Sequence, residues 1–243
     1  MIGINSTAIV VPVRNEAQSL PSCIAGLRVA IAHAGREYPG VAVAVRFALD
    51  RCSDCSAEII ESAGFGWVDS VRPGVGAARA TGVGAALGTL GSDPDRVLIA
   101  CTDADSIVPP DWLTHQIDLA NGGADVIVGA VEPNSADLDS ERRRAWEITH
   151  RDGQARGHVH GANLALRASV YLTAGGFEPV LEHEDVDLVS RAIALGARLK
   201  TTEASRVVTS GRLEGRTPGG YAGYLRDDLL SLANGLFGEQ SVA

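Results

Sequence analysis

The sequence has no apolar run long enough to cross a membrane, and its amino terminus has no basic segment. A membrane-spanning helix needs about 20 predominantly apolar residues, and no run among these 243 residues approaches that length. The opening stretch MIGINSTAIVVPV carries no lysine or arginine before its apolar residues, which indicates a first strand rather than a signal peptide. We therefore expect no transmembrane segment and a cytoplasmic location.

Cysteine is also scarce, with four residues in the whole chain. That number is too small for a disulfide scaffold of this length. The stretch CSDC at 52–55 has the spacing of a redox or zinc pair. A structural zinc site usually takes four Cys or His ligands, and only His158 and His160 offer a distant second pair. The count favours a loop that carries two thiols.

Net positive charge is absent, since the chain carries a formal charge of −9. This balance argues against nucleic acid or an anionic membrane as the main partner. Local arginines could still bind a phosphorylated small molecule. The glycines near Gly74 match neither the dinucleotide fingerprint nor the P-loop spacing. No feature of the sequence indicates the oligomeric state.

The first half of the chain alternates short apolar runs with helical patterns. This alternation predicts an α/β fold, with a mostly parallel sheet that carries helices on both faces. Strands are expected at 7–13, 41–50, 67–72 and 96–101, and helices at 16–35, 53–64 and 74–91. Ser53 or Asp54 is the expected cap of the second helix.

After about residue 110 the pattern is more mixed, although no linker, repeat or low-complexity tract interrupts it. We expect one compact unit over 1–243 with two functional halves. Helices are expected near 110–121, 138–150, 184–196 and 219–234, and strands at 125–131, 161–167, 198–202 and 206–210. The arginines at 142–144 are expected on a solvated helix face rather than in a cleft.

Three polar clusters follow predicted parallel strands, at Pro12–Glu16, Asp50–Asp54 and Thr102–Ser106. Ligands of open α/β sheets bind beyond the carboxyl ends of the strands. The three clusters therefore predict a binding site on one rim of the sheet.

Asp103 and Asp105 lie one residue apart, so an extended backbone points them to the same side. A Mg²⁺ or Mn²⁺ ion that takes one or two carboxylates plus substrate phosphates would relieve their repulsion. The alternative is a helix start capped by Asp105 or Ser106. Spacing alone does not separate the two.

Two further charged positions have both a functional and a structural interpretation. Arg79 could bind a phosphate or a base edge, or it could lie on a solvated helix face. Glu184 and Asp185 open an amphipathic helix, where acidic residues favour the helix dipole. Alternatively, one of these carboxylates faces the cleft as a general base.

Taken in order, these segments resemble family 2 glycosyltransferases of the GT-A fold from about residue 7 to 226. IVVPVRNEAQSLPSCIAGL is similar to the family's opening strand and first helix, and LDRCSDCSAEI to its Asp-rich loop. GVGAARATG resembles its Gly-x-(Ala)-Arg segment, and TDADSIVPPDWL its metal-binding Asp-x-Asp. GANLALRASVYLTAGGFEPVLEHEDVDLVSRAIALGARL resembles its acceptor half.

The resemblance implies a GT-A-like sheet with a nucleotide-sugar half at about 1–106 and an acceptor half at about 107–243. It also implies a role for individual residues. The base and ribose of a nucleoside diphosphate sugar would be bound by Pro12, Arg14, Glu16, Asp50 and Arg79. Asp103 would lie near the ribose or sugar, and Arg212 and Arg216 would close over the diphosphate. Asp105 would ligate a divalent metal, Asp185 would deprotonate the acceptor hydroxyl, and Glu184 would contact the acceptor or orient its loop.

The implied activity is a metal-assisted, inverting transfer of a sugar, hexosyltransferase-like, to an unknown hydroxyl. Some members carry a histidine ligand after the Glu-Asp pair, but the last histidine here is His183. Polymer synthases carry a Gln-x-x-Arg-Trp that this chain lacks, which favours single transfers. The alternatives are a sugar-phosphate nucleotidyltransferase, disfavoured because VRNEAQSL follows the first strand in place of a Gly-rich loop, and a non-catalytic nucleotide-sugar-binding protein.

Overall fold

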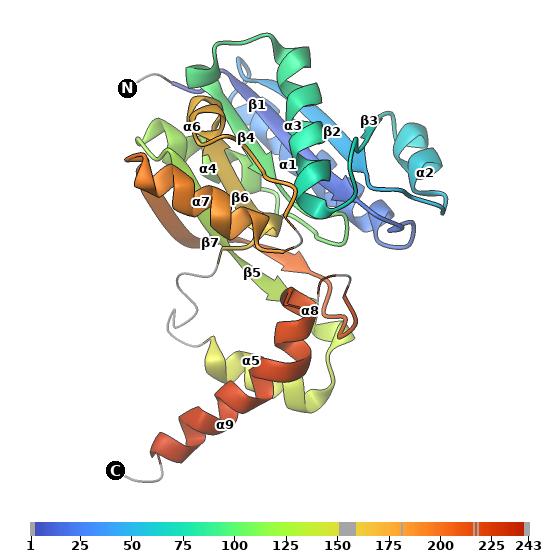
Figure 1. Ribbon diagram of the computed structural model, residues 1–243, viewed down its shortest axis with the longest axis vertical. Helices are drawn as coiled ribbons and strands as arrows, with labels where there is room; N and C mark the ends of the chain where they lie inside the picture. Colours follow the sequence, from blue (N-terminus) through green and yellow to red (C-terminus); the bar gives the residue numbers. More distant parts are fainter. Residues whose placement is uncertain (1–2, 151–158, 181, 216, 218, 241–243) are drawn as a thin grey trace.

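The computed structural model describes residues 3–150, 159–180, 182–215, 217 and 219–240. Its centre is a seven-stranded sheet with the strand order β3-β2-β1-β4-β6-β5-β7 (Figure 1). The strands are β1 (Ser6–Val13), β2 (Ala42–Leu49), β3 (Gly66–Asp69), β4 (Val97–Cys101), β5 (Val126–Pro133), β6 (Leu164–Arg167) and β7 (Leu199–Thr209). Strand β6 runs antiparallel to both of its neighbours, and every other pairing is parallel. The prediction of a mostly parallel sheet is confirmed.

Helices cover both faces of this sheet. They are α1 (Leu20–Glu37), α2 (Ser56–Ser62), α3 (Val75–Leu90), α4 (Trp112–Asn121), α5 (Ser140–Thr149), α6 (Ala168–Thr173), α7 (Glu184–Ala194), α8 (Tyr221–Gly223) and α9 (Leu229–Gln240), with one π-helical turn (Tyr224–Asp228) between the last two. One face packs against α1, α2 and α4, and the other against α3, α6 and α7.

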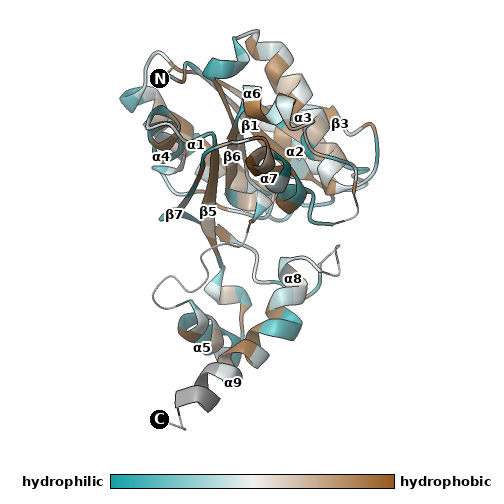
Figure 2. Ribbon diagram, turned by 60° about the vertical axis from the view of Figure 1, so that its left-hand side comes forward, coloured by the Kyte–Doolittle hydropathy of each residue, from teal (hydrophilic) through white to brown (hydrophobic). Residues whose placement is uncertain are grey.

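Strand β1 shows why two separate cores form. All eight of its residues are buried, and successive side chains of a strand point to opposite faces. Ile9 and Val11 therefore enter the first core, whereas Ala8 and Val10 enter the second. The hydrophobic residues accordingly concentrate in the strands and on the inner sides of the helices (Figure 2).

A third, smaller core lies beyond the end of β5, where α5 packs against α9 (Figure 1). Its buried side chains are Leu138, Ala145, Leu225, Leu229 and Ala233. Of the predicted surface arginines, Arg142 joins α5 to the π-helical turn, whereas Arg143 binds the chain just before α5. Arg142 donates to the carbonyl oxygens of residues 225 and 226, and Arg143 to those of residues 135 and 138. We call α5, α8, the π-turn and α9 the helical extension.

Several boundaries differ from the predicted ones. The two strands expected at 198–202 and 206–210 form the single strand β7, which is bulged where Ser205 adopts a φ of 54°. Helix α6 was not predicted. The expected caps of α2 were wrong, because Cys55 is its N-cap residue, while the Asp54 side chain accepts hydrogen bonds from the amides of residues 17 and 56. Among the described residues, no helix is long and apolar enough to span a membrane.

All strands except β6 run in the same direction, which brings the carboxyl ends of six strands to one edge of the sheet. There the loops after β1 and β2 turn sharply, and Asn15 and Arg51 both adopt a φ of 52°. Left-handed backbone is uncommon outside glycine and often occurs at functional sites. The Asn15 side chain accepts a hydrogen bond from the Ser53 amide at 2.7 Å, which holds the two loops together.

Candidate functional site

A cleft of about 1730 Å³ opens at this edge of the sheet. Its walls come from the carboxyl ends of β1, β2, β4, β5 and β7, the start of α7 and the helical extension. It brings together the predicted site residues Pro12, Arg14, Glu16, Asp50, Arg79, Asp103, Asp105, Glu184, Asp185 and Arg212. Arg216 lies outside the described residues. A typical small-molecule pocket has a volume of about 300–1,000 Å³, so this cleft has room for more than one ligand.

Asp50 forms one end of the cleft, directly after β2. The residue is buried, and its Oδ2 accepts a hydrogen bond from the Gly74 amide at 3.0 Å and pairs with Arg14 at 3.4 Å. Gly74 has a φ of 108°, which a residue with a side chain rarely adopts. Oδ1 of Asp50 is buried and has no hydrogen-bond partner among the described residues. An N–H donor of a ligand would satisfy that oxygen.

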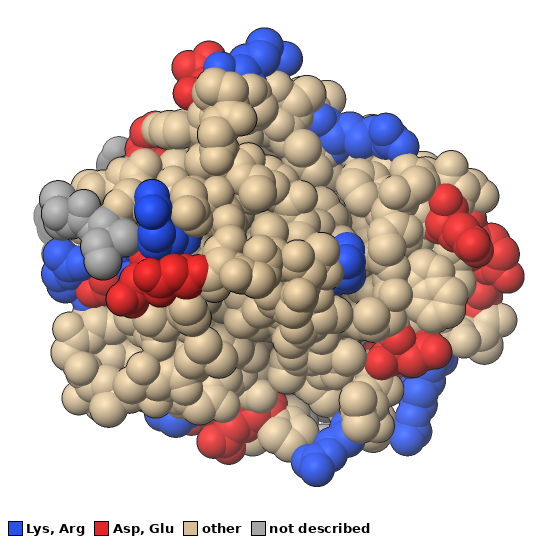
Figure 3. All heavy atoms as spheres, turned by 90° about the horizontal axis from the view of Figure 1, so that it is seen from above, with Lys and Arg blue, Asp and Glu red and all other residues tan. Residues whose placement is uncertain are grey.

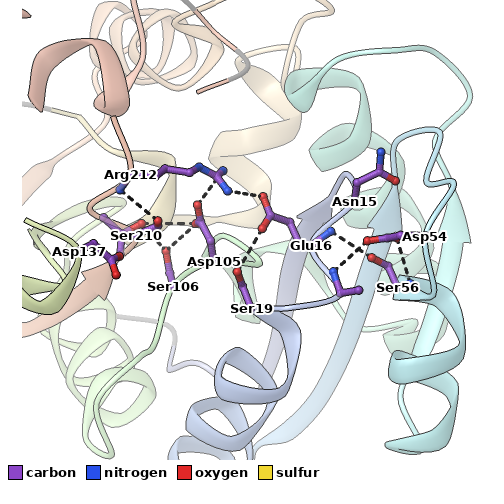
Figure 4. A network of polar contacts seen from close by, with 12 residues as sticks. Asn15, Glu16, Ser19, Asp54, Ser56, Asp105, Ser106, Asp137, Ser210 and Arg212 are labelled. Atoms are coloured by element: carbon purple, nitrogen blue, oxygen red, sulfur yellow. Dashed lines mark hydrogen bonds and ion pairs between the residues drawn. The ribbon is translucent and has the colours of Figure 1, made fainter. Parts of the chain in front are cut away.

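Arg212 bridges two rim carboxylates that are far apart in the sequence. Its Nη1 lies 2.9 Å from Oε1 of Glu16, and its Nη2 lies 2.9 Å from Oδ2 of Asp105 (Figure 4). The loop that carries Arg212 follows β7 and is anchored by a hydrogen bond from the Gly211 amide to Asp137. The positively charged guanidinium of Arg212 therefore lies between the carboxyl ends of β1 and β4.

Asp105 is an unusual carboxylate. Burial of the group, together with the nearby negative charges of Asp103 and Glu16, raises its pKa to about 6, although Arg212 acts in the opposite direction. Its Oδ1 also lies 3.5 Å from the hydroxyls of Ser106 and Thr209. The site thus disfavours a bare negative charge here and favours one that is matched by a cation.

Arg79 lies beneath the cleft, contrary to the alternative of a solvated helix face. Its side chain is 4% exposed, and Nη2 lies 2.5 Å from Oδ1 of Asp103. Its Nη1 is paired with Oε1 of Glu184. These two carboxylates raise the pKa of Arg79, and burial raises the pKa of Glu184. The partners of Arg79 are therefore carboxylates of its own chain.

Gly161 explains how the start of α7 is held against this cluster. A side chain at this position would collide with the Arg79 guanidinium. The Gly161 amide donates to Oδ2 of Asp185 at 2.7 Å. The carboxylate of Asp185 is only half-buried and lines the cleft.

Glu184 and Asp185 lie in the first turn of α7, as the helix-dipole alternative expects, but their carboxylates also contact other elements. His183 is the N-cap residue of α7, with a φ of 62° and no capping hydrogen bond from its side chain. The carboxylate of Glu184 is used by Arg79, and that of Asp185 by the amides of Gly161 and Val186. The pair therefore joins α7 to two other elements.

Across the described residues, no group of three or more His, Cys, Asp or Glu side chains forms a complete metal site. Asp105 and Asp103 supply the carboxylate oxygens that Mg²⁺ and Mn²⁺ prefer, and phosphate oxygens would have to complete the set. Cys52 and Cys55 are both free thiols, and burial raises the pKa of Cys52.

Some residues of the cleft were not predicted from the sequence. Tyr221 and Tyr224 line its far end, and Glu182 accepts a hydrogen bond from the Gly219 amide at 3.2 Å. The only sequence signal for these residues was the pair of glycines at 219 and 220, which end a loop just before the two tyrosines.

Seen from above, acidic and basic groups lie mostly around the edge of the molecule, with no continuous basic patch on that face (Figure 3).

The sequence matches the family model described as "Glycosyl transferase family 2" over residues 8–171. No curated protein matches it. Solved structures with the same architecture are similar at low sequence identity.

S. aureus TarS 1–349 in complex with UDP-GlcNAc has a TM-score of 0.66 at 12% identity, covering 90% of this chain and 62% of that one. The chain thus spans less than two thirds of that fragment. The mannosyltransferase PcManGT from Pyrobaculum calidifontis, in complex with GDP-Man and Mn²⁺, has a TM-score of 0.61 at 17% identity. The match covers 100% of this chain and 76% of that one. Glucosyl-3-phosphoglycerate synthase from Mycobacterium tuberculosis, in complex with phosphoglyceric acid, has a TM-score of 0.60 at 16% identity. The match covers 96% of this chain and 81% of that one. The chain has the GT-A fold of these glycosyltransferases.

Proposed function

This chain belongs to glycosyl transferase family 2, and on that premise we propose that it moves a sugar from a nucleoside diphosphate to an acceptor hydroxyl. The transfer is hexosyltransferase-like, inverts the anomeric centre and adds one residue at a time. One observation carries the proposal. The lining of a single cleft includes Asp50, the Asp105–Arg212 pair and the carboxylate of Asp185, which is held by a backbone amide.

The nucleoside occupies the end of the cleft beside β1 and β2. The unsatisfied Oδ1 of Asp50 accepts an N–H of the base, while Pro12 and Arg14 lie against base and ribose. The complexes of TarS with UDP-GlcNAc and of PcManGT with GDP-Man support a nucleotide sugar as donor. Residues from about 1 to 106 form the donor half, and those from about 107 to 243 the acceptor half.

Asp105 is the residue that holds a divalent metal, Mn²⁺ or Mg²⁺. Two features of the chain fit this role. The carboxylate is buried beside two other acidic groups, so it gains from a nearby cation, and it already pairs with one in Arg212. The Mn²⁺ in the PcManGT complex also supports it. When bound, the metal would offset the negative charge that develops on the diphosphate.

The arginines of the cleft have different tasks. Arg212 is 39% exposed and sits on a loop, so it can turn from Glu16 and Asp105 toward the diphosphate. Arg79 is buried, and it positions Asp103 near the ribose or sugar and Glu184 under the acceptor. A direct contact between Arg79 and the base stays a prediction from the sequence.

Asp185 is the general base. Its carboxylate takes the proton of the acceptor hydroxyl while the acceptor oxygen bonds to the anomeric carbon. The bond from that carbon to the phosphate oxygen breaks, and the nucleoside diphosphate leaves with the electron pair. Attack from the face opposite the leaving group inverts the configuration. A cytoplasmic location stays a prediction from the sequence.

A donor panel tests the proposal. Purified protein is incubated with UDP-, GDP- and dTDP-hexoses with Mn²⁺ or with EDTA, and binding and release of nucleoside diphosphate are measured. We expect one nucleotide sugar to bind and to be slowly hydrolysed with Mn²⁺, and Asp105→Asn to lose most of the gain from the metal. Binding without turnover, even with an acceptor mixture, would favour a binding protein. Formation of a nucleotide sugar from a sugar phosphate and a nucleoside triphosphate would favour a nucleotidyltransferase.

A further inference from the structure

Aromatic residues are rare in this chain, at 5% of the sequence, yet several gather at the far end of the cleft. The rings of Tyr221 and Tyr224 are stacked, with centroids 6.1 Å apart and an interplanar angle of 28°. Trp146 supports both from behind through edge-on contacts at 6.1 and 6.4 Å. His160 meets Tyr221 edge-on at 5.5 Å. We call Tyr221, Tyr224 and His160 the aromatic wall.

The aromatic wall is joined to the proposed base by short connections. His160 directly precedes Gly161, whose amide holds the carboxylate of Asp185. On the other side, the Gly219 amide donates to Glu182, so the loop before Tyr221 is tied to the loop before α7. The aromatic wall and the carboxylate of Asp185 are therefore linked within one cleft.

The described side chains around the wall favour an uncharged ligand over an anionic one. Arg206 is one of the described arginines that line the cleft, and it pairs with Glu203 at 3.0 Å and Glu132 at 3.5 Å. Asp228 and Glu182 add negative charge. An anionic acceptor would gain no free cation from these side chains and would be repelled by the acidic groups.

We propose that the aromatic wall is the acceptor subsite and that the acceptor is an uncharged sugar ring, an inference that rests on the proposed function. The electron-rich face of a tyrosine attracts the C–H face of a pyranose, while the ring hydroxyls stay at its edge. The Tyr221 hydroxyl is buried without a hydrogen-bond partner among the described residues. A sugar hydroxyl would satisfy it and remove the cost of leaving it unpaired.

Saturation-transfer NMR with methyl hexopyranosides tests this inference in the presence of Mg²⁺ and the nucleoside diphosphate that binds best. The variants Tyr221→Leu and Tyr224→Leu keep apolar volume but remove the ring, and Tyr221→Phe removes only the hydroxyl. Tyr38→Leu, at the C-cap of α1, is the matched control. We expect the two leucine variants to weaken pyranoside binding by about tenfold or more. Tyr221→Phe should weaken it by about threefold, and Tyr38→Leu should leave it unchanged. Nucleotide affinity and melting temperature are measured for each variant.

Two results would overturn the inference while leaving the proposed function intact. One is tight binding of the nucleoside diphosphate with pyranoside signals that do not change in the tyrosine variants. The other is the absence of pyranoside binding when phosphoglycerate or a long-chain alcohol in micelles does bind. Failure of the wild-type protein to bind any nucleoside diphosphate is a separate readout, and it would refute the proposed function itself.

Discussion

Replacing Arg212 with glutamine should change the affinities for metal and for nucleotide in opposite directions. In the free protein the guanidinium bridges Glu16 and Asp105, and a metal at Asp105 has to displace it. In the complex we expect the same guanidinium to contact the diphosphate. Arg212→Gln should therefore bind Mn²⁺ alone more tightly and the nucleoside diphosphate with Mn²⁺ less tightly.

The size of the effect follows from the two ion pairs. A hydrogen bond to a charged group contributes about 1.5–3 kcal/mol. The Arg212 side chain is 39% exposed, so solvent screening lowers this to about 1 kcal/mol for each pair. Releasing both costs about 2 kcal/mol, which corresponds to an increase of about thirtyfold in the affinity for Mn²⁺ alone. The affinity for the nucleotide should fall by about tenfold.

Titration of free Mn²⁺ by electron paramagnetic resonance and nucleotide calorimetry measure the two effects. Both belong at pH 8, since Arg212 keeps the pKa of Asp105 from rising above about 6 and its loss would raise that pKa further. Arg206→Gln is the matched control, because that arginine also lines the cleft but pairs with other carboxylates. If Arg212→Gln bound Mn²⁺ no better than the wild type, the bridge would not compete with the metal, and this reasoning would be wrong.

Four other predictions test the proposed base, two sets of contacts in the cleft and one ion pair of the fold. Asp185→Asn should lower the transfer rate by about 10²–10⁴-fold with nucleotide affinity unchanged, and transfer at the wild-type rate would exclude the base role. Arg79→Met should reduce the free energy of unfolding by about 3–5 kcal/mol in urea titrations, because it leaves buried carboxylates unpaired; adding Glu184→Gln should restore part of this, and no recovery would contradict the pairing. Asp50→Ala should weaken nucleotide binding by about tenfold in calorimetry, while its circular dichroism spectrum stays native. Unchanged affinity would place the nucleobase elsewhere. Hydrogen bonds from Arg198 lower the pKa of Asp125 below its usual 3.8, so this carboxylate stabilises the fold above that pH and loses its effect as the pH falls. Asp125→Asn should therefore cost about 1 kcal/mol at pH 7 and less as the pH falls toward 2, and an equal cost at both values would refute the linkage.

The side of the cleft beside β1, β2 and β4 was predictable because it depends on local order in the chain. Asp50 and Asp103 each follow an apolar run, and parallel strands place such residues on a common edge. The buried position of Arg79 was not predictable, since its role depends on Glu184, 105 residues further along the chain. A pattern of small residues in α3 says that the helix lies close to the sheet, but not which side chain faces a carboxylate.

The side of the cleft beside β7 and the helical extension was harder to predict for a related reason. The bulge in β7 divides one strand into two apolar patterns, so the sequence indicated two strands. Arg212 and Glu16 are separated by 196 residues and meet only because β7 ends on the same rim as β1. Tyr221 and Tyr224 stack across the short helix α8, directly before a π-helical turn that has no distinct sequence signal.

The helical extension has a core of its own, made of Leu138, Ala145, Leu225, Leu229 and Ala233. Two of the three aromatic-wall residues stand on this core, whereas Asp50 and Asp105 stand on the large cores of the sheet. Amide hydrogen exchange should therefore be faster in α5 and α9 than in β1 or β4, because a small core opens at a lower free-energy cost. The same division makes the extension an exchangeable part: on the proposed function, grafting a different helical pair onto β5 and β7 would change which acceptor binds without rebuilding the proposed donor pocket.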